Sequence, residues 1–237
     1  MTPVLTDTRL IVGLDLPSLD AARAMVDRLG ATIRFYKIGL TLLARPGGVA
    51  FAHELQASGR MVFQDWKLHD IGAQVEGAAR AVAEGGCDLL TVHAEPQVMR
   101  GAVKGRDAAG TATKLLAVTV LTSLSDDDLK AIGYASGARS LVERRIHQAL
   151  EAGCAGVVAS PQEAELARRI GGKDFLVVTP GVRPEWSAKN DQVRAATPAE
   201  ALRAGASHLV CGRPISAAND PAEAALKVIA EMAAVPA

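Results

Sequence analysis

The sequence predicts a (β/α)8 barrel, built as a single domain over residues 1–237. Short apolar runs recur at regular intervals, and Ala-rich amphipathic segments separate many of them. This alternation is typical of parallel α/β folds, and the length of 237 residues is near the roughly 250 of such a barrel. A doubly wound open sheet is the alternative fold with the same alternation. Neither a Pro/Ser-rich linker nor a shift in composition divides the chain, which favours one domain.

Eight short apolar runs are expected to form the strands. The runs cover residues 10–16, 34–40, 61–67, 88–94, 114–121, 155–160, 175–181 and 208–213. Helices are expected between them, several beginning at a Ser or Pro, which are typical of helix starts. Their ranges are 18–29, 74–84, 141–152, 161–169, 198–204 and 221–233. A further helix start is expected at Asp126, directly after Ser125.

Polar residues follow the apolar part of most of these runs. In a (β/α)8 barrel the catalytic groups lie at the carboxyl ends of the strands, so such residues are candidates for chemistry. The sixth run, which ends near Ser160, supplies nothing comparable. In chain order the candidates are Asp15, Lys37, Asp65 with Lys67, His93, Thr122 with Ser123, Arg183 and Arg213. Solvated surface charges would not be expected to follow the strand ends so regularly.

The stretch FQDWKLHDIG contains three charged residues close together. Side chains two positions apart on a strand point to the same side, so Asp65 and Lys67 are expected to share a face, with Asp70 just beyond the strand end. Charged residues are rarely placed on a buried face for stability alone. An ammonium near two carboxylates is favoured in its charged form. The stretch therefore predicts a site that handles charge.

Two Arg-containing loops predict a phosphate site. The loops after strands seven and eight of barrels often bind phosphate, and here they read TPGVRP, with Arg183, and CGRPI, with Gly212 and Arg213. Glycine lets the backbone come close, and Arg offers paired donors to phosphate oxygens. Segment 182–196, which contains Gln192, is expected to close over a ligand as a lid. The alternative is that Arg213 caps a strand and the segment is an ordinary loop.

Composition and charge argue against several classes of function. Lys and Arg total 26, as do Asp and Glu, so neither nucleic acid nor an anionic membrane is expected as a partner. No apolar run is long enough to span a bilayer, and no secretory signal pattern opens the chain. Because Cys87, Cys154 and Cys211 lie far apart, we expect free, mostly buried thiols and a cytoplasmic location. No metal is expected, since the histidines and cysteines lack the spacing of a zinc site.

Six short motifs occur in order from Leu14 to Ile215: LDL, YKIGL, FQDWKLHDI, VTVLTS, TPGVRP and CGRPI. Together they resemble the bacterial type of the orotidine 5′-phosphate decarboxylase family. The resemblance implies decarboxylation of orotidine monophosphate to uridine monophosphate, the last step of pyrimidine nucleotide synthesis, without a metal or cofactor. It also implies a homodimer whose active sites lie at the subunit interface.

The resemblance implies roles for most of the candidate residues. Loss of CO2 from C6 of the pyrimidine leaves a carbanion with no adjacent carbonyl, so catalysis requires fixed charge and a proton donor, both of which Lys67 can supply. Asp65 would lie near the departing carboxylate. The other implied roles are a charge network completed by Lys37, a ribose contact from Asp15, a pyrimidine contact from Thr122, phosphate contacts from Arg183, Gln192, Gly212 and Arg213, and contacts of Asp70 and Ile71 with the neighbouring subunit's site.

Two positions depart from the family pattern. Gln74 stands where the family usually has Thr, which changes the shape of an expected hydrogen bond across the interface. Asn190 stands where Gly is expected in the lid, and Asn tolerates a left-handed backbone better than most residues.

Two alternative functions fit parts of the pattern. A magnesium-dependent keto-gulonate phosphate decarboxylase or hexulose phosphate synthase shares the Asp, Lys, Asp motif but has no need of Thr122. A catalytically silent nucleotide-binding barrel would accommodate Gln74, but the presence of Lys67 and both aspartates argues against it. His69 and His93 are expected to be structural, because Lys67 already supplies the proton.

Overall fold

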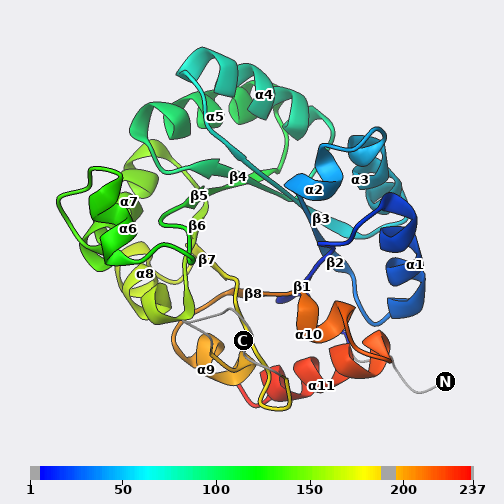
Figure 1. Cartoon of the computed structure of the whole chain (residues 1–237). Helices are drawn as coiled ribbons and strands as arrows, with labels where there is room; N and C mark the ends of the chain where they lie inside the picture. Colours follow the sequence, from blue (N-terminus) through cyan, green and yellow to red (C-terminus); the bar gives the residue numbers. More distant parts are fainter. Residues whose placement is uncertain (1–5, 188–195, 236–237) are drawn as a thin grey trace.

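A computed structural model describes residues 6–187 and 196–235. Eight parallel strands form a closed barrel in the order β1 to β8, and the helices surround this ring of strands (Figure 1). The predicted (β/α)8 barrel is confirmed. The strands are β1 (Leu10–Gly13), β2 (Phe35–Gly39), β3 (Met61–Leu68), β4 (Leu89–His93), β5 (Lys114–Val118), β6 (Gly156–Val158), β7 (Leu176–Thr179) and β8 (His208–Cys211).

Most strands are shorter than the predicted runs at their carboxyl ends. The first run was expected to extend to residue 16, whereas β1 ends at Gly13 and Asp15 lies in the loop beyond it. The fifth run loses its last three residues in the same way, since β5 ends at Val118. The chain leaves the hydrogen-bonded ladder early at this end of the barrel, where the loops form the mouth. Strand β3 differs, because it continues to Leu68.

Helices occupy all of the predicted ranges; the helix over 221–233 has the predicted ends, and the others differ at one or both ends. They are α1 (Leu19–Leu29), α4 (Gly72–Glu84), α7 (Ala138–Ala152), the short η1 (Pro161–Glu163) followed by α8 (Ala164–Gly171), α9 (Pro198–Arg203) and α11 (Pro221–Ala233). The expected helix start after Ser125 is confirmed as α6 (Asp126–Ala131), where Ser125 and Asp128 form a capping box. The helices missed from the sequence are α2 (Leu40–Leu43), α3 (Gly48–Ala57), α5 (Pro96–Ala109) and α10 (Arg213–Ser216).

Helix α5 was missed because it contains two glycines, which disfavour a helix. Packing against α4 explains both residues. A Cβ atom at Gly105 would overlap the carbonyl oxygen of Glu76, and one at Gly101 would overlap that of Gly72. The missing side chains let α5 lie directly against the backbone of α4.

The barrel has an interior layer and an outer layer of buried side chains. The interior cluster takes one residue from each of seven strands, in keeping with the alternation of side chains along a strand: Ile11, Phe35, Phe63, Leu89, Leu116, Val178 and Val210. A larger cluster joins the outward-facing strand residues to the helices. Trp66 packs against this outer cluster.

The three cysteines are free and buried, as expected. Burial raises the pKa of each thiol to about 12. These thiols are therefore uncharged at neutral pH and act as small apolar core residues. Among the helices of residues 6–187 and 196–235, none has the length and apolar character needed to cross a membrane.

Candidate active site

A cavity of about 320 Å³ opens at the carboxyl ends of the strands. Its floor includes Phe63 and Val210 from the interior cluster. The cavity is lined by eight of the residues predicted from the sequence: Asp15, Lys37, Asp65, Lys67, Thr122, Arg183, Gly212 and Arg213. The barrel thus brings together polar residues that span almost two hundred positions of the chain, roughly the whole barrel sequence. The predicted role of each residue stays a prediction.

Four charged side chains form an alternating row in this cavity. Lys37 Nζ lies 3.1 Å from Asp15 Oδ1 and 3.5 Å from Asp65 Oδ2. Lys67 Nζ lies 2.8 Å from the same Asp65 oxygen. Asp65 therefore sits between two ammonium groups. Its side chain and that of Lys37 are each only 11% exposed, which strengthens these electrostatic interactions relative to those at the surface.

Glycines leave room for this row. A Cβ atom at Gly39 would lie 2.9 Å from Asp15 Oδ1 and 3.2 Å from Lys37 Nζ. One at Gly13 would lie 3.3 Å from Asp15 Oδ2. Both glycines are at the ends of strands β1 and β2, so the contact between Asp15 and Lys37 depends on small residues that the sequence alone did not mark as part of the site.

Strand β3 is irregular where its charged residues lie. The register against β4 shifts between Gln64 and Leu68, so that residues 65–67 lie opposite the single residue Thr91. Lys67 has a left-handed φ of 49°. The side chains of Asp65 and Lys67 line the same cavity, as predicted. The expectation of a regular strand through these residues is wrong, because the strand contains a bulge. A bulge of this kind re-aims side chains and is frequent beside active sites.

Thr91 contacts both charged residues of the bulge and was missed by the sequence analysis. Its Oγ1 accepts a hydrogen bond of 2.9 Å from the Lys67 backbone N–H and donates one of 2.8 Å to Asp65 Oδ1. Thr91 is fully buried. Within the apolar strand LLTVH, a threonine is an ordinary β-branched strand residue, so only the bulge in the neighbouring strand reveals its position.

The carboxyl group of Asp65 has a perturbed pKa. Burial is the largest influence and acts to raise it, but the charges of Lys37 and Lys67 and the hydrogen bonds from Lys67 and Thr91 outweigh burial. The pKa is held below its ordinary value of 3.8. Because the folded-state pKa is depressed, these interactions contribute stability above pH 3.8 and lose it as the pH falls through the folded-state pKa.

The residues predicted to bind phosphate come from the loops after β7 and β8. Arg183 is buried, and its Nη1 donates a hydrogen bond of 2.9 Å to the Val182 carbonyl oxygen. Gly212 precedes α10, which begins at the exposed Arg213. Both guanidinium groups belong to residues that line the cavity. Gln192, predicted to contact phosphate from the lid, lies outside the described residues, as does Asn190.

The three residues predicted to act at the subunit interface lie outside the cavity lining. Asp70, Ile71 and Gln74 are exposed where β3 passes into α4. Asp70 Oδ1 accepts a hydrogen bond of 2.6 Å from the Ile71 N–H, and the apolar Ile71 is 62% exposed. Within one chain, Lys67 is therefore paired with Asp65, and Asp70 lies apart from this pair.

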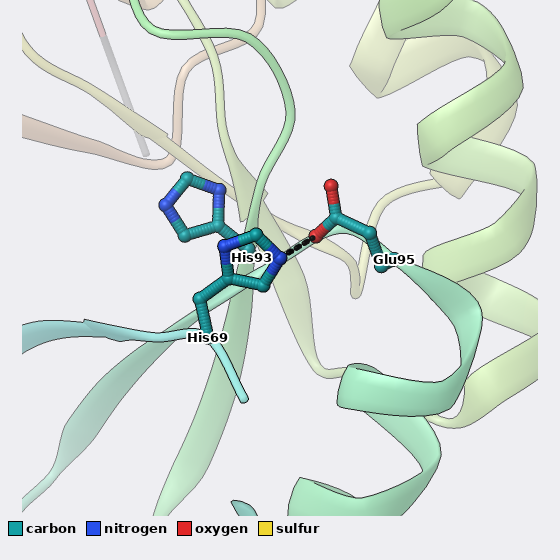
Figure 2. A group of neighbouring side chains, drawn as sticks. All are labelled: His69, His93 and Glu95. Carbon is teal, nitrogen blue, oxygen red and sulfur yellow. Dashed lines mark ion pairs between the residues drawn. The ribbon is translucent and has the colours of Figure 1, made fainter. Parts of the chain in front are cut away.

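A second cluster, formed by His69, His93 and Glu95, lies between β3, β4 and the start of α5 (Figure 2). The two imidazole rings are 4.7 Å apart, His69 Nε2 is 3.6 Å from Glu95 Oε2, and the ligand-type atoms lie within 4.8 Å of one another. Glu95 also binds the Arg145 guanidinium at 2.9 Å. Burial lowers the pKa of His93, Glu95 opposes this, and the neighbouring His69, Arg145 and Lys67 side chains lower it further. Since the one carboxylate of the cluster already pairs with the Arg145 guanidinium, we interpret the cluster as a tilted pair of histidine rings and not as a cation site.

The closed barrel, with its charged cavity at the carboxyl ends of the strands, defines a (β/α)8-barrel enzyme. The sequence model described as "Orotidine 5'-phosphate decarboxylase / HUMPS family" matches residues 8–228. The chain belongs to this family, as the sequence motifs predicted.

Individual relatives agree with this assignment. An orotidine 5′-phosphate decarboxylase of Caulobacter vibrioides is 67% identical over 233 residues, covering 97% of this chain and 99% of the relative. One from Rhodopseudomonas palustris is 53% identical over 225 residues, with 95% and 94% covered. The crystal structure of orotidine 5′-phosphate decarboxylase from Lactobacillus acidophilus superposes with a TM-score of 0.84 at 35% identity, covering 95% of this chain and 99% of that one.

Proposed function

We propose that the protein decarboxylates orotidine 5′-monophosphate to uridine 5′-monophosphate in pyrimidine synthesis, without a metal or cofactor. The observation that carries the proposal is the alternating row of Asp15, Lys37, Asp65 and Lys67 inside the cavity. The names of relatives with up to 68% identity over the aligned length support the same substrate.

The reaction breaks the bond between C6 and the carboxylate, and the electron pair stays on C6 as CO2 leaves. No adjacent carbonyl accepts this pair, so the protein must stabilise it by charge. The ammonium of Lys67 stabilises the developing carbanion and then transfers a proton from Nζ to C6. Solvent afterwards returns a proton to Lys67. Asp65, held by Lys37 and Thr91, orients the ammonium from 2.8 Å away.

Other cavity residues bind the parts of the substrate that do not react. Asp15 accepts a hydrogen bond from a ribose hydroxyl, and Thr122 offers its hydroxyl to the pyrimidine amide. Arg183, Arg213 and the backbone of Gly212, together with Gln192, bind the phosphate. This arrangement is supported by the residues that line the cavity, which include Asp15, Thr122, Arg183, Gly212 and Arg213.

The experiment that tests the substrate offers the purified protein orotidine monophosphate and follows the ultraviolet absorbance of the pyrimidine. We expect conversion to uridine monophosphate. In a parallel reaction, keto-gulonate 6-phosphate with Mg²⁺ should not be decarboxylated. If orotidine monophosphate is not converted while the sugar phosphate is, the assignment within the family is wrong; if neither reacts, a silent nucleotide-binding barrel is favoured.

We further propose a homodimer in which Asp70 and Ile71 of each subunit, with Gln74 beside them, complete the site of the partner. The position of these exposed residues outside their own cavity supports this proposal. The apolar side chain of Ile71, which is 62% exposed outside the cavity, suits a covered surface. The three buried free cysteines support a reducing compartment, and we place the enzyme in the cytoplasm.

Shared sites can be tested by mixing two inactive variants. Lys67→Ala removes the proton donor of its own site, and Asp70→Asn damages the site of the partner. After subunit exchange, each mixed dimer should contain one site with both native residues, so activity should reappear. Each variant incubated alone is the control. If native mass spectrometry demonstrates mixed dimers and no activity returns, the sites are not shared.

A further inference from the structure

We propose that Thr91 is a positioning residue of the active site, whose buried hydroxyl holds the Asp65 carboxylate and the Lys67 backbone in the arrangement that aims the Lys67 ammonium. The kinetic consequence rests on the proposed function. The structural consequence, the anchoring of Asp65, can be measured without any substrate.

The hydroxyl of Thr91 uses its donor and an acceptor position at once. It donates to Asp65 Oδ1 at 2.8 Å while accepting from the Lys67 N–H at 2.9 Å. Asp65 Oδ2, the other oxygen of the same carboxylate, pairs with Lys67 Nζ at 2.8 Å. Thr91, Asp65 and Lys67 therefore form a closed loop of three interactions, in which one hydroxyl fixes both ends of the catalytic pair.

The bulge in β3 explains why such an anchor is needed. Three residues of β3, 65–67, face one residue of β4, so the Lys67 N–H finds the Thr91 hydroxyl in place of a backbone carbonyl. The left-handed φ of 49° at Lys67 is unfavourable for a residue with a side chain. Surrounding contacts must hold such a backbone in place. The hydrogen bond from the Lys67 N–H to Thr91 acts on the strained residue itself.

Thr113 shows what a buried threonine with a purely structural role looks like in this barrel, and its hydrogen bonds differ from those of Thr91. Thr113, just before β5, is also buried, and its Oγ1 donates to the backbone carbonyl of Cys87 at 2.7 Å. It is not among the residues that line the cavity. The hydroxyl of Thr91 instead donates to a charged side chain that lines the cavity, and its hydrogen bond is among the influences that keep the pKa of Asp65 low.

The test compares Thr91→Val, Thr91→Ser and the matched control Thr113→Val. Valine has nearly the shape of threonine but neither donates nor accepts, whereas serine keeps the hydroxyl. For Thr91→Val we expect kcat to fall about 10²-fold with little change in KM, as for a small misplacement of a catalytic group. Thr91→Ser should recover most of kcat, and Thr113→Val should retain it. Wild-type kcat in Thr91→Val, or a serine variant as impaired as the valine variant, would overturn the proposal.

A second readout uses the ligand-free protein. The Asp65 carboxyl is followed by ¹³C NMR as the pH is lowered, and its signal is assigned with Asp65→Asn. Its pKa should rise in Thr91→Val and return towards the wild-type value in Thr91→Ser; an unchanged pKa in Thr91→Val contradicts the anchoring role. If the wild type fails to convert orotidine monophosphate, the proposed function fails while this titration still decides the role of Thr91.

Thr91→Cys keeps the test decisive if the valine variant does not fold. Cysteine fills a similar volume but is a weak donor. Its kcat and its effect on the Asp65 titration should resemble those expected for valine, whereas a cysteine variant equal to Thr91→Ser in both measurements would remove the case for the hydroxyl. Thermal unfolding of every variant gives the control for folding.

Discussion

Lys67→Ala is expected to lower kcat for orotidine monophosphate by about 10⁴-fold or more. A general acid contributes about 10²–10⁴ to a rate and a preorganised charge about 10²–10³, and Lys67 is proposed to supply both. The variant also leaves Asp65 with one ammonium partner, Lys37, at 3.5 Å. The pKa of Asp65 should therefore rise from its depressed value, because one of the charges that lower it is lost.

The measurement is kcat and KM for purified Lys67→Ala beside Lys104→Ala. Lys104 is the matched control because it is an exposed lysine that pairs with Glu76 at 2.9 Å outside the cavity. Lys104→Ala should keep wild-type kinetics. Circular dichroism and thermal unfolding would show that both variants are folded. Activity of Lys67→Ala within about tenfold of wild type, which corresponds to only about 1.4 kcal/mol of barrier, would remove Lys67 from the chemical step.

Arg213→Ala is expected to reduce kcat/KM for orotidine monophosphate by about 10²- to 10⁴-fold. Hydrogen bonds to charged groups are worth about 1.5–3 kcal/mol, and the guanidinium can make two of them to phosphate. Binding of this remote group helps to assemble the site, so kcat should fall together with affinity. For orotidine, which lacks the phosphate, the variant and the wild type should react at nearly the same rate.

The decisive quantity is the loss of kcat/KM that Arg213→Ala causes with orotidine monophosphate, divided by the loss that it causes with orotidine. Arg203 provides a control arginine, since it is exposed at the end of α9 and does not line the cavity. Arg203→Ala should leave both substrates unaffected. If Arg213→Ala slows orotidine as much as its phosphate ester, Arg213 acts on the fold or on the reacting ring and is not a phosphate ligand.

The barrel was predictable because apolar runs alternate with amphipathic segments, and each run feeds one strand of the closed sheet. The position of the charged residues was predictable for the same reason, since parallel strands bring their carboxyl ends to one face. Asp15, Lys37 and Asp65 could therefore be placed in one cavity from residues far apart in sequence. The family resemblance implied a charge network completed by Lys37, and in the structure Lys37 Nζ lies 3.5 Å from Asp65 Oδ2.

The details that set the geometry were not predictable from the sequence. The bulge in β3 depends on how β4 pairs with it, which no pattern within FQDWKLHDIG reveals. Thr91 resembles any β-branched strand residue until that pairing is known. The two glycines of α5 conceal a helix because their benefit lies in contact with α4. Whether Asp70 enters a partner's site depends on a surface between two chains, about which one chain's periodicity carries no information.

The protein is proposed to decarboxylate its substrate with its own fixed charges and without a metal. The most direct test is the rate at which metal-free enzyme releases CO2 from orotidine monophosphate. The protein is dialysed against EDTA, analysed for residual metal, and assayed with EDTA present and again after addition of Mg²⁺. We expect the same kcat in both assays, because Lys67 and its carboxylate partner supply the charge and the proton. Loss of activity in EDTA that Mg²⁺ restores would contradict this mechanism.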